Sequence, residues 1–135
     1  MLFSGSDNRL SGDPSAVVRQ FCAAIRSGDK KTVQNISTPE LNRRAEDLWE
    51  RRAIPTHGYE NNRRINFSEL EQWQFIWGSL AYPDEIGSVS HEISGNKAWV
   101  TIVFRNGSDG SVSLVKIDGR WKINSVIGMD GYLRY

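Results

Sequence analysis

The chain has 135 residues, of which 39% are hydrophobic and 24% are charged, and its formal net charge at pH 7 is +1. A single domain of this length buries roughly two-thirds of its unfolded surface, which is enough for an apolar core. The near-neutral charge argues against a long-range field for nucleic acid or anionic membrane. One cysteine, Cys22, excludes an internal disulfide and a cysteine-built zinc site.

Residues 1–12 are small and polar after Leu2 and Phe3, which is typical of a flexible lead-in. The segment 2–6 resembles the end of a lipoprotein signal, with Ser6 at the place of the lipidated cysteine. One hypothesis is therefore an exported, periplasmic or cell-envelope protein whose lipid anchor is absent from this sequence. The alternative is a natural cytosolic start.

Three helices are expected in the first half of the chain. Asp13 before Pro14 predicts a capped helix start, and Gly28 predicts its end. Between them, apolar residues recur at intervals of three and four, namely Val17, Val18, Phe21, Cys22 and Ile25. Cys22 lies on this stripe and is interpreted as a small buried side chain rather than a reactive thiol. A short helix follows Asp29, and a third runs from Thr38-Pro39 to Pro55.

Arginine pairs in residues 38–66 suggest RNA or phosphate binding at first sight. The segment holds six arginines and five acidic residues, and several of these charges lie four residues apart, as Asp47 and Arg51 do. This spacing is typical of a solvated helix surface with internal ion pairs. A nucleic-acid partner is therefore not predicted.

Residues 54–66 are predicted to be irregular, and long loops in compact domains are often functional. Ser68 and Glu71 then form a capping-box pattern that starts a helix reaching Leu80. Three tryptophans on the helices, Trp49, Trp73 and Trp77, predict an aromatic layer over a sheet. Such a layer is more often core packing than a ligand cage.

Residues 85–127 read as four strands separated by turn residues at 95–96, 106–110 and 118–119. A two-residue loop at 95–96 pairs His91 with Val100, and a five-residue loop at 106–110 pairs Phe104 with Val112. The predicted inner face contains Val89, His91, Ile93, Ala98, Val100, Ile102, Phe104, Val112, Leu114 and Ile123. The predicted outer face contains Trp99, Thr101, Val103, Val115, Ile117 and Val126.

The order of these motifs, from Pro14 through Ser27-Gly28-Asp29 to the strand that ends at 118–123, resembles the nuclear transport factor 2-like (cystatin-like) superfamily. It is most similar to a small bacterial lipoprotein branch of uncharacterised function. The resemblance implies an α+β fold in which N-terminal helices pack into a strongly bent four-stranded antiparallel sheet, a cone. It divides the chain into a lead-in at 1–12, a domain at 13–128 and a tail at 129–135.

Catalytic members of that superfamily place an acid or base inside the cone, and His91 is the weak candidate here. Burial among apolar side chains would favour its neutral imidazole, which suits a general base. The alternative is a core histidine satisfied by a backbone carbonyl. The remaining candidates for a pocket are Trp73, Trp77, His57 and Tyr59. No metal site or cofactor is predicted, because the two histidines are far apart and no Gly-rich phosphate loop is present.

Two functions remain open at this stage. The first is a non-catalytic interaction or scaffold domain of a bacterial envelope protein. It would dock a partner protein or a second copy through Trp99, Val103, Val115 and Ile117, as the outer sheet face does in many members of the superfamily. The second is a small-molecule-binding protein, or an isomerase-like or cyclase-like enzyme, with a pocket inside the cone.

Overall fold

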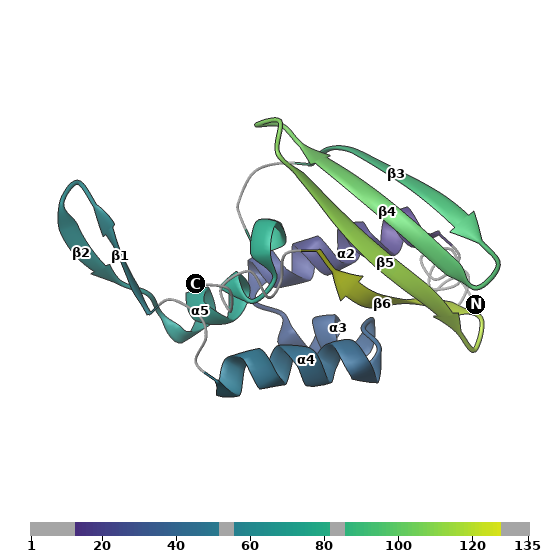
Figure 1. Cartoon of the computed structure of the whole chain (residues 1–135), viewed down its shortest axis with the longest axis horizontal. Coiled ribbons are helices and arrows are strands. Elements are labelled where there is room, and N and C mark those ends of the chain that lie inside the picture. Colours follow the sequence, from purple (N-terminus) through teal and green to yellow (C-terminus); the bar gives the residue numbers. More distant parts are fainter. Residues whose placement is uncertain (1–12, 52–55, 82–85, 128–135) are drawn as a thin grey trace.

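The computed structural model describes residues 13–51, 56–81 and 86–127. Helices are followed by a four-stranded antiparallel sheet of order β3-β4-β5-β6, so the predicted α+β class is confirmed (Figure 1). In chain order the elements are α2 (Pro14–Ser27), α3 (Lys30–Asn35), α4 (Pro39–Glu50), β1 (His57–Glu60), β2 (Arg63–Asn66), α5 (Glu69–Phe75), the 3-10 helix η1 (Gly78–Ala81), β3 (Ile86–Ser94), β4 (Lys97–Phe104), β5 (Asp109–Ile117) and β6 (Arg120–Val126).

The predicted helix starts are confirmed by their caps. The carboxylate of Asp13 accepts a hydrogen bond from the Ser15 amide at 2.9 Å, and Gly28 ends α2 with a φ of 77°. Ser68 and Glu71 form the complete capping box of α5. Pro55, which was expected to end the third helix, lies outside the described residues. The helices therefore begin where short polar side chains satisfy free backbone amides.

The pairing of β3 with β4 is as predicted, with His91 opposite Val100. The predicted length of five residues for the loop before β5 is wrong, because Val112 pairs with Val100 and not with Phe104. The amide of Phe104 donates to the Ser108 carbonyl at 2.9 Å, which shortens the loop. The resulting displacement of β5 is an even number of residues, so each side chain keeps its predicted face. Phe104 and Val112 are both buried.

An irregularity in the pairing of β5 with β6 changes one assignment. Leu114 pairs with Ile123 as predicted, but the register shifts between Ser113 and Leu114. Val112 is consequently opposite Val126 instead of Ser125. An extra residue in one strand turns the following side chain to the other face. Val126 is therefore buried at 5% exposure, and its assignment to the outer face is wrong.

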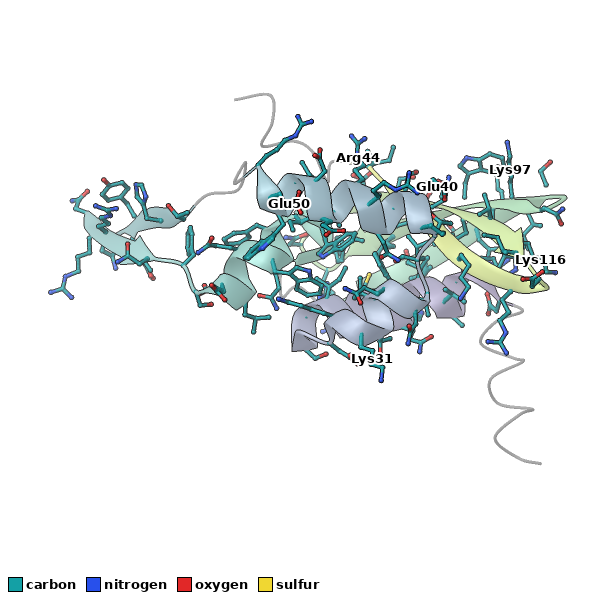
Figure 2. All side chains as sticks on the ribbon, turned by 90° about the horizontal axis from the view of Figure 1, so that it is seen from below. Lys31, Glu40, Arg44, Glu50, Lys97 and Lys116 are labelled. Atoms are coloured by element: carbon teal, nitrogen blue, oxygen red, sulfur yellow. The ribbon has the colours of Figure 1, made fainter. Side chains whose placement is uncertain are left out.

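The segment predicted to be irregular contains a β-hairpin, β1 paired with β2. Asn61 and Asn62 form its tip with φ values of 52° and 64°. Positive φ at both central residues gives a turn whose twist matches that of the strands, and asparagine tolerates this conformation. The hairpin extends away from the rest of the molecule (Figures 1 and 2).

The core lies between the inner face of the sheet and the helices. α2 contacts β3, β4, β6 and η1, while α4 contacts β6. The largest side chains with almost no exposure are Trp77, Phe21, Ile25, Leu41, Ile76, Leu80, Ile102, Leu114 and Ile123. They come from both halves of the chain, so the helices cover one face of the sheet.

Residues 36–38 run beside β6 and join α4 to the sheet. The amide of Ile123 donates to the Ile36 carbonyl at 2.7 Å, and the amide of Thr38 donates to the Ile123 carbonyl at 2.8 Å. Thr38 is buried. Its hydroxyl caps α4 by accepting from the Leu41 amide at 3.1 Å, and donates to the side chain of Asn124 at 3.2 Å.

We expect Thr38→Ala to lower the free energy of unfolding by about 1–2 kcal/mol, because a buried cap and a bond to β6 are lost together. Urea denaturation followed by circular dichroism measures this loss. Ser68→Ala is the matched control, since Ser68 is an exposed cap whose hydroxyl bonds within its own helix start. An equal or larger loss in the control would show that the link to β6 adds no stability.

Candidate functional site

His91 does not lie in an apolar interior. Its side chain is 36% exposed, and its Nδ1 lies 2.6 Å from the hydroxyl of Ser15 and 3.9 Å from the carboxylate of Asp13. The imidazole does face α2, as predicted. The predicted burial is wrong, because β3 is an edge strand and His91 lies beside the start of α2, at Asp13 and Ser15. Ile93, further along β3, is 51% exposed for the same reason.

His57 and Tyr59 lie on β1, in the projecting hairpin. Their rings meet edge to face with centroids 5.9 Å apart, and Tyr59 is 72% exposed. Neither residue lines a pocket with Trp73 and Trp77. Of the five residues predicted to form a pocket, only these two tryptophans line the pocket described next.

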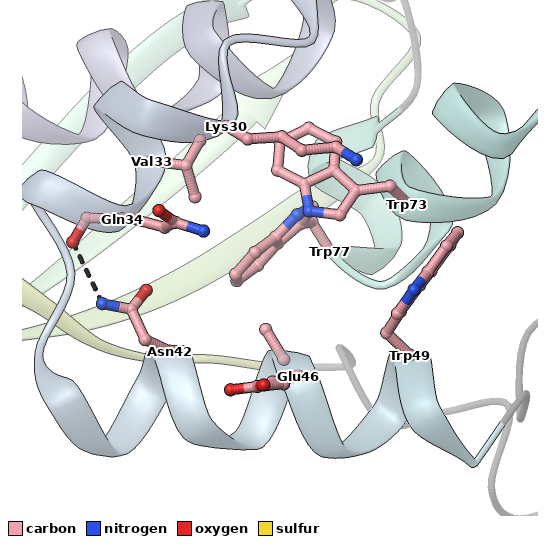
Figure 3. Close-up of a pocket in the computed structure, with 9 residues that line it drawn as sticks. Lys30, Val33, Gln34, Asn42, Glu46, Trp49, Trp73 and Trp77 are labelled. Atoms are coloured by element: carbon pink, nitrogen blue, oxygen red, sulfur yellow. Dashed lines mark hydrogen bonds between the residues drawn. The ribbon is translucent and has the colours of Figure 1, made fainter.

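A pocket lies between α3, α4 and the segment from α5 to η1 (Figure 3). Its volume is about 490 Å³, within the range typical of small-molecule sites. Three indoles form much of its wall. The lining residues are Lys30, Val33, Gln34, Asn42, Ala45, Glu46, Trp49, Trp73 and Trp77.

Trp77 and Trp73 connect this pocket to the core. Their ring centroids are 6.1 Å apart at an interplanar angle of 74°, and Trp77 packs edge to face on Phe21 at 5.3 Å. Edge-to-face contacts of this kind fix ring orientation as well as burying area. Two of the three indoles in the wall are therefore packed together, and Trp77 joins them to α2.

The polar lining comes from the exposed sides of α3 and α4. The ammonium of Lys30 lies over the rings of Trp49 and Trp73, at 5.7 Å and 5.5 Å from their centroids. The side-chain amide of Asn42 donates to the Gln34 carbonyl at 3.0 Å, which links the two helices across the pocket. None of these polar residues was predicted from the sequence, because on isolated helices they match any solvated face.

A hydrogen-bonded cap fixes the helix that carries Lys30. The hydroxyl of Thr32 donates to the Asp29 carboxylate at 2.7 Å, and the amide of Thr32 donates to the same carboxylate at 3.2 Å. These bonds stabilise the charged carboxylate and lower the pKa of Asp29 below its usual value. α3 therefore begins at a defined residue, and Lys30 is the first residue of this helix.

A second candidate site is the outer face of the sheet. Trp99 is 47% exposed, while Val103 and Ile117 are each 40% exposed and Val115 is partly buried. The described helices pack on the opposite face (Figure 1). Many of the other side chains of this face are short and polar, for example Ser90, and Trp99 is its largest exposed apolar side chain.

Cys22 is buried, as predicted, and burial raises the pKa of its thiol to about 11 against the opposing effect of Arg26. Among residues 13–51, 56–81 and 86–127, no group of three or more His, Cys, Asp or Glu side chains is placed to hold a metal ion. No helix in those ranges combines the length and apolar character needed to cross a membrane.

Comparisons of the chain with models of protein families, with curated proteins and with solved structures found no match.

The thiol of Cys22 should not react in the folded protein. With a pKa of about 11, about one thiol in a thousand is ionised at pH 8, and the thiolate is the reactive form. We expect no labelling by a disulfide reagent at pH 8 over hours, and one thiol per chain after addition of guanidinium chloride. Rapid labelling without denaturant would show that α2 opens readily or that Cys22 is accessible.

Proposed function

We propose that this chain is a non-catalytic interaction domain that docks a protein through the outer face of its sheet. The observation that carries the proposal is the exposure of Trp99, Val103 and Ile117 on a face that no described helix covers. Tryptophan is enriched among the residues that dominate protein interfaces, because one ring buries a large area.

A second copy of the same chain is the partner that the surface fits most directly. Glu92 pairs with Trp99 across the strands, and Lys97 lies two residues before Trp99 on the same face. Charges of both signs thus flank the central ring, so two copies of the face do not repel each other. A two-fold arrangement would place the two Trp99 patches together, with the short serine side chains allowing close approach.

The wider setting of this proposal follows from the resemblance described above. We therefore also propose that the chain belongs to the nuclear transport factor 2-like superfamily and that its sheet is bent into a cone. We further propose that it is part of an envelope protein with a lipid anchor. Support comes from the order of the elements, in which capped helices precede a four-stranded antiparallel meander.

The second candidate function is the binding of a small molecule. A specific observation favours it, namely the pocket of about 490 Å³ with three indoles in its wall. His91 does not line this pocket. The pocket therefore supports binding more directly than it supports an isomerase-like or cyclase-like reaction with His91 as the base.

Replacing Trp99 by lysine should convert a dimer into a monomer. A buried charge in place of the central ring should cost at least about 2 kcal/mol, a roughly thirtyfold weaker dimer. Sedimentation equilibrium over a range of protein concentrations measures the change. Tyr59→Lys is the matched control, because it alters an exposed aromatic residue on the hairpin and should leave the mass unchanged. A monomeric wild-type protein at all concentrations would sink the proposed self-association.

A further inference from the structure

The lining of the pocket between α3, α4 and α5 includes one ammonium, that of Lys30, and one carboxylate, that of Glu46. No carboxylate of the described residues forms an ion pair with Lys30, whose ammonium lies over the faces of Trp49 and Trp73. The two rings hold the ammonium at the mouth of the pocket without neutralising it. An anionic group that enters there would meet a cation that is already in position.

A second donor lies deeper, at Trp77. This residue is 1% exposed, and its indole Nε1–H is buried without a hydrogen-bond partner in the described part of the chain. A buried donor without an acceptor costs free energy, because it has lost its bond to water. Trp77 lines the same pocket as Lys30, while its Nε1 atom is buried within the wall (Figure 3).

The rest of the pocket wall favours an apolar body. Val33, Ala45 and the faces of Trp49, Trp73 and Trp77 offer flat hydrophobic surface. The one carboxylate of the lining, Glu46, lies on the α4 side of the pocket, away from Lys30 (Figure 3). The pocket's preference for the charge of a ligand would thus depend on the end where Lys30 lies.

We propose that this pocket binds a small organic carboxylate with an aromatic or other flat apolar body. The carboxylate pairs with Lys30, and the body lies among the indoles. A cationic ligand is disfavoured, because the faces of Trp49 and Trp73 already hold the ammonium of Lys30, which such a ligand would have to expel. This inference rests on the small-molecule function given above as the second candidate and is independent of docking at the outer face.

The experiment uses three probes with one body and different charges: 3-phenylpropionate, 3-phenylpropan-1-ol and 3-phenylpropylamine. Isothermal titration calorimetry at low salt should show the carboxylate binding roughly fivefold to tenfold more tightly than the alcohol, and the amine more weakly than either. Lys30→Gln should remove this preference and leave the binding of the alcohol unchanged. Lys30 is exposed, so this variant should fold.

Lys31→Gln is the matched control, because it removes the same charge from the next residue of α3. Lys31 is exposed, does not line the pocket, and points away from it (Figure 2). It should retain the preference for the carboxylate. Equal losses in both variants would overturn the inference by showing that only the overall charge matters.

The other outcomes separate the inference from the function on which it rests. Binding of the alcohol or the amine as tightly as the carboxylate would overturn the ligand class but leave a binding pocket. Failure of all three probes to bind would contradict both.

Discussion

The apolar stripe of α2 buried against the inner face of the sheet is the interaction on which the rest of the structure depends. Val18, Phe21 and Ile25 have no measurable exposure, and each such burial contributes about 1.5–3 kcal/mol. A four-stranded antiparallel sheet needs cover on one face and tolerates water on the other. Once α2 occupies the inner face, the remaining described helices pack around α2 and the edge of the sheet, and none of them covers the outer face.

This arrangement explains why the pocket is found between helices. α4 reaches the sheet only at β6, and α5 joins the body through η1. Trp77 fills the position nearest the core by packing on Phe21, while Trp73 and Trp49 lie further out. The space that these helices leave among themselves is lined by rings on the inside and by charged side chains at its mouth. The aromatic layer expected over the sheet is thus partly core and partly the wall of a pocket.

Local patterns allowed much of the fold to be predicted from the sequence. The caps at Asp13 and Ser68 and the turn at residues 95–96 depend on neighbouring residues only, and each is found as expected. The predicted length of the loop before β5 was wrong, because several turn residues follow one another there and any of them can begin or end the turn. The two-residue period of a strand still preserved the faces. Asn61 and Asn62 are typical turn residues, but the hairpin around them was not predicted because the whole segment 54–66 was interpreted as one long loop.

The features that could not be predicted depend on distant parts of the chain. His91 is exposed because β3 lies at the edge of the sheet and α2 begins beside it, and neither fact is encoded near residue 91. The inward turn of Val126 follows from a bulge that alternation alone does not reveal. Lys30 and Lys31 are adjacent lysines on the surface of α3, and only the tertiary arrangement distinguishes Lys30 by placing two indoles beside it.

The hydrogen bonds that join residues 36–38 to β6 have a consequence for how the protein is made. Ile36 and Thr38 leave the ribosome long before Ile123, yet their backbone groups bond directly to that residue. The N-terminal helices can therefore form individually during synthesis, but α4 has no sheet to pack on until the last strand emerges. Contacts of such long sequence separation slow folding, and they leave the apolar sides of these helices exposed in the meantime. The growing chain thus depends on the solubility of its charged helix faces.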